Sequence, residues 1–457
     1  MYNPLKDICL YKEDTMNAEH NSNHLKRDIG FITALSIVIG TVIGSGVFMK
    51  PGEVLASSGN AKMALFAWLL GGLITLASGL TVAEVGAQIP KTGGLYIYLE
   101  ETYGKFWGYL CGWVQTVVYG PAVIAALGLY LGSLIVHLFG LDESWLKGIG
   151  IGFVVLLMLV NITGTKYGGW VQNISTAAKL IPIVLIIIFG LWKGEQSIFT
   201  PGAFEPEEFS FGAAVLATLF AYDGWILVGS VAGEMKNPTK LLPKVIFIGL
   251  AGVTVVYLLV NMALLYVVPA GDIVKLGENA ASTAATTLFG DFGGILITIG
   301  IIISIFGCLN GKIMAFPRIP YAMAKNGQLP FSKGLGKVHP KFHTPYVSII
   351  LQAAIATVFM LISDPNRLSD ISVFSIYLFY IFAFFAVFTL RRRNSGKERP
   401  YSVPLYPLVP LVAILGSIYI IVSMLQHDPV GGLGAIFIMV IGLPVYYFIK
   451  RKATDQV

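Results

Sequence analysis

Charged residues are scarce in this sequence. They make up 12% of its 457 residues, whereas a soluble globular chain carries about 25%. Apolar residues make up 55%, and the mean hydropathy is +0.75. This composition excludes an ordinary soluble protein and predicts an integral membrane protein.

Cysteine and histidine are also rare. Cys9, Cys111 and Cys308 are too few and too far apart for a disulfide framework or a metal site. The six histidines lie in the tail, in connections or at the end of an apolar run: His20, His24, His137, His339, His343 and His427. The apolar runs hold no cluster of His, Asp and Glu with metal-ligand spacing. These absences disfavour a membrane-embedded enzyme, and we expect neither a metal nor a cofactor.

Long apolar runs are abundant instead. A helix of roughly 17–25 mostly apolar residues is long enough to span a bilayer. Twelve such runs are present: 31–57, 63–89, 106–139, 148–164, 171–192, 209–232, 243–268, 282–314, 345–362, 371–390, 404–425 and 431–449. They predict an all-α integral membrane protein with 12 transmembrane helices.

The basic residues are distributed unevenly between the two sides that twelve spans define. Of the 31 lysines and arginines, 23 lie in the N-terminal tail, the even-numbered connections and the C-terminal end. The others are Lys50, Lys62, Lys147, Lys193, Lys275 and Arg367 on the opposite side, and Lys179 and Lys312 within runs. Since basic residues are enriched on the cytoplasmic side, we expect a plasma-membrane protein with both termini in the cytoplasm. Residues 1–29 are expected to form a cytoplasmic tail rather than a signal peptide.

Glycines interrupt the first apolar run at its centre, in the stretch Gly44-Ser45-Gly46. Each glycine costs roughly 1 kcal/mol relative to alanine in a helix interior, which favours a break. A broken helix leaves free N–H groups and a partial positive charge at the gap, and both suit a carboxylate. The alternative is that Gly40 and Gly44 let two helices pack closely.

A second glycine, Gly224, interrupts the sixth run beside Asp223, within the stretch 220–225. The two interrupted helices open two blocks of five spans, and an odd number of spans gives the blocks opposite orientations. Paired broken helices in inverted repeats indicate a transporter with its site at the bilayer midplane. We expect a first repeat at 30–193, a second, inverted repeat at 209–393 and two additional helices at 404–450.

Four polar side chains within the runs are candidates for function, each with a structural alternative. Lys179 lies so deep in its run that an inward-facing functional lysine is favoured over snorkelling. For Glu84, pairing with a basic loop residue is favoured over gating, and for Tyr119, packing is favoured over ligand contact. Asn261 either bridges helices or belongs to the site, and the sequence does not separate these alternatives.

Together, the stretches 44–48 and 220–225 and the segments 84–96 and 323–330 resemble one family. From about residue 28 to 450 the sequence resembles the L-amino acid transporter family of the amino acid–polyamine–organocation superfamily, especially its bacterial serine/threonine exchangers. The resemblance implies the leucine-transporter fold: ten core helices in a 5+5 inverted repeat, broken helices 1 and 6, and two extra helices.

The resemblance also implies a site. The substrate carboxylate would meet the N–H groups and hydroxyl around Ser45 and Gly46, and the substrate amino group would meet main-chain carbonyls. Lys179 matches the family lysine that takes the place of sodium, so transport would not need sodium. The expected substrate-binding residues are Val42, Ile43, Gly44, Ser45, Gly46, Phe220, Ala221, Asp223 and Gly224. The expected gating or supporting residues are Phe220, which would shield the site from outside, Tyr119 and Asn261.

The expected function is therefore sodium-independent exchange of small neutral L-amino acids such as serine and threonine. The alternative is a proton-coupled or facilitative carrier of amino acids or amines on the same fold. Asp223 matches a position in carriers of dibasic amino acids, but alone it does not predict cationic substrates. Eukaryotic relatives bind a glycoprotein heavy chain through a cysteine in a loop that corresponds to Gly140–Lys147, which has none. We expect amino acid substrates and membrane lipid as partners, with no covalent heavy chain and no nucleic acid.

Overall fold

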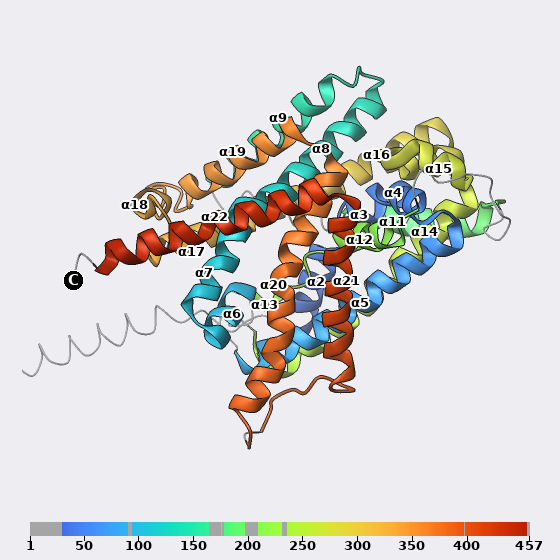
Figure 1. The fold of residues 1–457 in the computed structure, drawn as a ribbon. Coiled ribbons are helices and arrows are strands. Elements are labelled where there is room, and N and C mark those ends of the chain that lie inside the picture. Colours follow the sequence, from blue (N-terminus) through green and yellow to red (C-terminus); the bar gives the residue numbers. More distant parts are fainter. Residues whose placement is uncertain are drawn as a thin grey trace, which may run out of the picture.

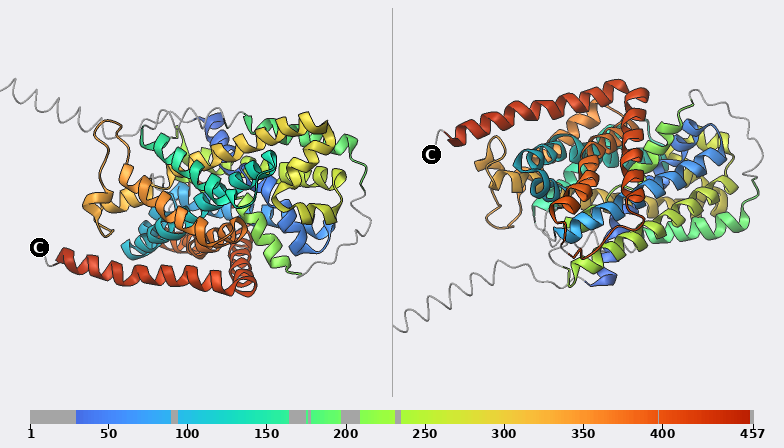
Figure 2. Two further views of the ribbon diagram at one scale, coloured as in Figure 1. Left: turned by 90° about the horizontal axis from the view of Figure 1, so that it is seen from above. Right: turned by 60° about the horizontal axis from the view of Figure 1, so that its bottom comes forward.

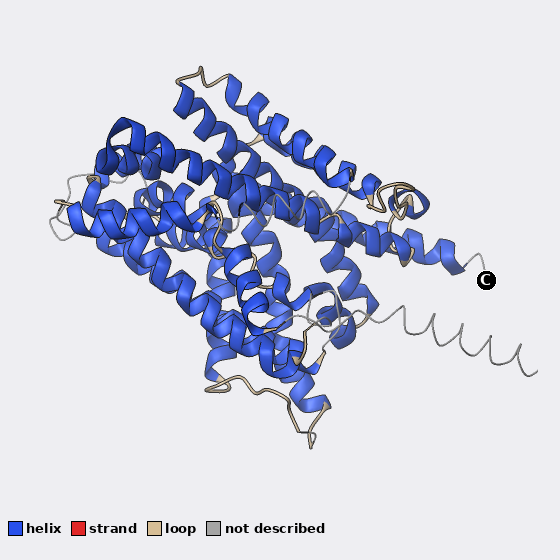
Figure 3. Cartoon of the chain, turned by 180° about the vertical axis from the view of Figure 1, so that it is seen from behind, coloured by secondary structure: helices blue, strands red, loops and turns tan. Residues whose placement is uncertain are grey.

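The computed structural model describes residues 30–89, 94–163, 175, 178–196, 209–230, 235–396 and 398–454. The described residues form helices joined by turns and contain no β-strand (Figures 1 and 3). The predicted tail, residues 1–29, lies outside the described part, as does most of the first half of the predicted span 171–192.

The described helices follow one another along the chain from α2 to α22. The first are α2 (Phe31–Val42), α3 (Gly46–Met49), α4 (Pro51–Ser58), α5 (Ala61–Gln88), α6 (Leu95–Tyr103), α7 (Lys105–Val114), η1 (Gln115–Tyr119), α8 (Gly120–Phe139), α9 (Trp145–Ile162) and α11 (Leu180–Lys193). Next come α12 (Phe211–Ala221), α13 (Leu227–Ser230), α14 (Pro238–Val267), α15 (Ala270–Leu276), η3 (Gly277–Asn279), α16 (Ala280–Ala315), α17 (Arg318–Lys325) and α18 (Ser332–Leu335). The last are α19 (Tyr346–Ile362), α20 (Pro365–Arg393), α21 (Leu408–His427) and α22 (Pro429–Thr454).

Nine helical stretches of the described chain are long and apolar enough to cross a membrane. Three shorter apolar helices, α11, α12 and α19, overlap the three predicted runs that remain. The protein is therefore a multi-pass membrane protein whose described part is helical, as the composition predicts.

α8 is buried along nearly its whole length. It packs against α9, α16, α19 and α20. Large apolar side chains are exposed on the outer helices instead, for example Leu156 on α9, Leu415 on α21 and Phe437 on α22. α22 runs along the outer edge of the molecule in both views of Figure 2. An outer surface formed by large apolar side chains suits contact with lipid.

Both predicted helix interruptions are present. α2 ends at Val42 and the helix resumes at Gly46, so that residues 43–45 are not helical. α12 ends at Ala221, and turns lead to α13 through Gly224, whose φ of +112° is rarely adopted by residues with a side chain.

The same glycines also permit close packing. A Cβ on Gly46 would lie 2.3 Å from Ala221 Cα, and one on Gly44 would lie 2.8 Å from Cys308 Sγ. A Cβ on Gly224 would lie 2.5 Å from the carbonyl oxygen of Thr41. The two interpretations of the glycines are therefore compatible: they break both helices and let the broken ends touch.

The predicted run 106–139 is helical, with a π-helical turn, η1, between α7 and α8. π-Helical turns inside α-helices are frequent at functional sites. η1 ends at Tyr119, and Pro121 follows in the first turn of α8.

Glu84 is paired, as favoured from the sequence. Its carboxylate accepts two hydrogen bonds of 2.7 Å from the Arg391 guanidinium and a third of 2.7 Å from the Val403 N–H. Glu84 is fully buried, and Arg391 belongs to the last turn of α20 rather than to a loop. The pair therefore joins α5 to one end of α20.

Replacing Arg391 with alanine should destabilise the protein. The Glu84 carboxylate would remain buried without its bidentate partner, and such a loss typically costs about 3–5 kcal/mol. We expect a clearly lower melting temperature in detergent for Arg391→Ala than for Arg392→Ala, because Arg392 is exposed on the same turn. Equal melting temperatures for the two variants would contradict a structural role for the pair.

Candidate functional site

The two helix breaks meet around a small buried cavity. It is lined by Thr41, Val42, Gly44, Ser45, Gly46, Val123, Leu127, Phe220, Ala221, Asp223, Cys308 and Lys312. Its free volume is about 20 Å³, enough for a water molecule but not for an amino acid. Seven of the nine residues expected to bind substrate line this cavity, and the other two, Ile43 and Gly224, lie in the breaks themselves.

Lys179 reaches into the first break. Its Nζ donates hydrogen bonds to the carbonyl oxygens of Gly40 and of Ile43, the latter at 2.8 Å. The last carbonyls of a helix have no partner within the helix, and Gly40 lies in the last turn of α2. Lys179 is 3% exposed, so it does not snorkel to the membrane surface. The inward orientation favoured from the sequence agrees with these contacts.

Tyr257, on α14, contacts both helix breaks. Its hydroxyl lies 3.0 Å from the Val42 carbonyl oxygen and 2.8 Å from the Ala221 carbonyl oxygen. With one proton, the hydroxyl donates to one carbonyl at a time while both remain within reach. Each carbonyl belongs to the last residue before a break, so one buried side chain links the two interrupted helices.

Asp223 is paired on both oxygens. The Tyr119 hydroxyl donates to Oδ1 at 2.6 Å, and the Lys312 ammonium donates to Oδ2 at 2.7 Å. The Asp223 and Lys312 side chains are 9% and 7% exposed. Tyr119 therefore makes a polar contact at the site in addition to packing, and Lys312 balances the negative charge of Asp223.

Phe220 separates the cavity from a second polar region. Its side chain lines the cavity, while its ring lies 5.5 Å from Lys50 Nζ and 6.2 Å from the Tyr130 ring. This position agrees with the shielding role that the resemblance implies for Phe220.

Asn261 lies away from the cavity. Its Nδ2 donates to the Tyr257 carbonyl oxygen at 2.8 Å, and its side chain lines a different small cavity beside Trp68 and Leu264. The structure therefore groups Asn261 with the residues that surround Tyr257 rather than with those that line the site.

Six residues at or beside the cavity were not among the predicted site residues: Thr41, Val123, Leu127, Cys308, Lys312 and Tyr257. Lys312 had a signal in the sequence, because a lysine inside a membrane span is costly unless it finds a partner. Cys308 and Tyr257 gave no such signal, since both are common in apolar helices.

The cavity, the two broken helices and the paired buried charges together define a helical membrane transport protein with a closed, polar site. The family model for amino acid permeases matches residues 29–446. The chain is 60% identical to serine/threonine exchanger SteT of Bacillus subtilis, over 94% of this chain and 98% of that protein. It is 35% identical to the human large neutral amino acids transporter small subunit 2, over 93% and 80% of the two chains. It is 30% identical to the human cystine/glutamate transporter, over 93% and 85%. The chain belongs to the amino acid permease family, whose members are transporters and not enzymes.

Replacing Lys179 with alanine should impair transport more than expression. Two carbonyls of the first break would lose their donor, and each unsatisfied buried group costs about 1–3 kcal/mol. We expect exchange to fall about tenfold or more in reconstituted Lys179→Ala. Lys193→Ala, which changes an exposed lysine at the other end of α11, is the control. Full activity in Lys179→Ala would contradict a role for this lysine at the break.

Proposed function

We propose that this protein exchanges small neutral L-amino acids such as serine and threonine across the plasma membrane without sodium. The observation that carries the proposal is the meeting of both helix breaks around a small cavity whose lining charges are balanced. Similarity over 94% of the chain to a protein named a serine/threonine exchanger supports the substrate class.

In the proposed binding mode the substrate carboxylate lies against the N–H groups and hydroxyl of Ser45 and Gly46. These residues begin α3, and the first N–H groups of a helix have no partner within it. The substrate amino group lies against carbonyls of Val42 and Phe220 and near Asp223. Since the cavity holds only about 20 Å³, substrate entry requires the broken halves to move apart.

Sodium independence follows from the contacts of Lys179. A bound sodium ion is held by oxygen ligands, and here an ammonium group occupies the carbonyl oxygens of Gly40 and Ile43. The positive charge is therefore part of the chain and need not bind and dissociate in each transport cycle.

The proposed architecture has twelve spans, with repeats at 30–193 and 209–393 and two further helices at 404–450. The two breaks, one near the start of each repeat, support this division. We place both termini in the cytoplasm because most basic residues lie on that side. The loop Gly140–Lys147 offers no cysteine to a heavy chain, so we propose that the protein works without a covalent partner.

Uptake into liposomes tests the proposed function directly. Vesicles loaded in turn with each of the twenty amino acids should take up labelled serine only when a substrate is inside, equally well in sodium and in choline. The substrate should be recovered chemically unchanged. Uptake into empty vesicles driven by a pH gradient would favour the proton-coupled alternative, and dependence on sodium would contradict both.

The balance of charge at the cavity should decide which substrates are accepted. Lys312→Met would leave the Asp223 carboxylate without its cation, and removing one partner of a buried pair typically costs about 2–5 kcal/mol. A cationic substrate could replace the lost charge. We expect uptake of 2,3-diaminopropionate relative to serine to rise about tenfold or more in Lys312→Met but not in Lys325→Met, which changes an exposed lysine on α17. An unchanged ratio would contradict the argument.

A further inference from the structure

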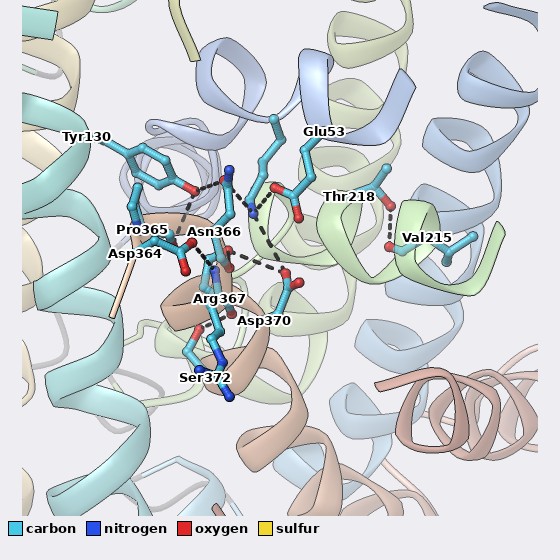
Figure 4. A network of polar contacts seen from close by, with 12 residues as sticks. Glu53, Tyr130, Val215, Thr218, Asp364, Pro365, Asn366, Arg367, Asp370 and Ser372 are labelled. Atoms are coloured by element: carbon cyan, nitrogen blue, oxygen red, sulfur yellow. Dashed lines mark hydrogen bonds and ion pairs between the residues drawn. The ribbon is translucent and has the colours of Figure 1, made fainter. Parts of the chain in front are cut away.

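A polar network surrounds Lys50, directly after the short helix that begins at the cavity (Figure 4). The Lys50 side chain is fully buried. Its ammonium donates hydrogen bonds to the Glu53 carboxylate and, at 3.1 Å, to Asn366 Oδ1, and it lies 3.7 Å from Asp370 Oδ1. Figure 4 shows the Glu53 side chain on one helix pointing toward those of Asn366 and Asp370 on another.

The network joins three elements that are distant in the sequence. Glu53 belongs to α4, in the second half of the first broken helix, whereas Asn366 and Asp370 belong to the first turns of α20. Tyr130 on α8 donates its hydroxyl proton to Asn366 Oδ1 at 2.8 Å. Lys50 thus ties the first broken helix to α20, with α8 as a support.

The network covers the site. Lys50 Nζ lies 5.5 Å from the centre of the Phe220 ring, and Phe220 lines the cavity. The order from the inside is therefore cavity, Phe220 and Lys50. Lys50 lies among the basic residues that we place on the extracellular side.

The network is stable only while the first broken helix and α20 stay in contact. A buried ammonium is stable only while carboxylates and other acceptors surround it, and two carboxylates close together in a buried site repel each other without a cation between them. Glu53 and Asp370 are 19% and 8% exposed, so water replaces Lys50 only when the helices separate. Lys50 therefore stabilises the closed arrangement specifically.

We propose that Lys50 keeps the extracellular entrance to the site closed. We call this entrance the extracellular gate and Lys50 its latch. The ion pairs of Lys50 with Glu53 and Asp370 hold the first broken helix against α20 and keep Phe220 closed over the site. α3 begins at Gly46, at the proposed carboxylate site, and Lys50 follows its last residue, Met49. Because α3 is a single helical turn, a movement of α3 when substrate binds or leaves also displaces Lys50. This inference rests on the proposed transport function and orientation.

A thiol at the cavity allows the gate to be tested without transport. Cys308 lines the cavity below Phe220, and replacing Cys9 and Cys111 with serine and alanine leaves it as the only cysteine. A membrane-impermeant maleimide, added to right-side-out vesicles without substrate, reaches Cys308 only while the extracellular gate is open.

We expect Lys50→Met and Asp370→Asn to increase the labelling rate about tenfold, the change that a loss of about 1.4 kcal/mol from the closed state produces. Lys50→Arg keeps the cation and should label as slowly as the parent. Arg367→Met is the matched control, because it removes a more exposed ion pair, with Asp428, from the same end of α20. Such a pair contributes about 0–1 kcal/mol.

If Lys50→Met and Asp370→Asn both label at the parent's rate and melt near the parent's temperature, Lys50 does not hold the gate closed and the proposal is wrong. An equal increase in Arg367→Met would contradict the proposal too, since it would indicate general loosening. Faster labelling confined to inside-out vesicles would overturn the extracellular placement. Because labelling needs no substrate, a failed uptake assay with latch-dependent labelling would count against the proposed function alone.

Discussion

The contact on which the site depends is the one between the Lys179 ammonium and the carbonyls of Gly40 and Ile43. An interrupted helix leaves carbonyls without partners, and in a membrane interior water does not replace those partners. Lys179 satisfies two of them, and Tyr257 contacts the terminal carbonyls of both breaks. These donors therefore stabilise both breaks and the cavity between them.

The other buried charges lie where separate elements meet. Asp223 and Lys312 join the second break to α16, Lys50 joins the first broken helix to α20, and Glu84 joins α5 to the opposite end of α20. α20 thus bears a buried ion pair at each end. Apolar contacts are similar for many arrangements of packed helices, whereas a buried charge that loses its partner costs about 3–5 kcal/mol. These pairs therefore specify how the elements fit together in the closed form.

The sequence predicted the features that have a local cause. A glycine pair in an apolar run predicts a break at residues 44–46, where the structure has one at residues 43–45, and a lysine deep in a span predicts the inward position of Lys179. The partners of Asp223 and Lys50 could not be predicted, because they come from helices whose neighbours the sequence does not reveal. For the same reason the sequence left two alternatives open for Asn261, a bridge between helices or a part of the site, and its side chain lies beside a different cavity.

The closed cavity constrains how substrates are distinguished. Gly46 approaches Ala221 so closely that not even a Cβ would fit, so the breaks cannot widen by side-chain rotation alone. Space for a substrate must come from movement of whole helix halves. In the proposed binding mode, main-chain groups of both breaks recognise the carboxylate and amino group that all amino acids share. Selectivity must then come from the side chains that line the rest of the cavity. In this mode Val123 and Leu127 on α8, a helix buried on nearly all sides, would limit the size of the substrate, and the Asp223–Lys312 pair would limit its charge.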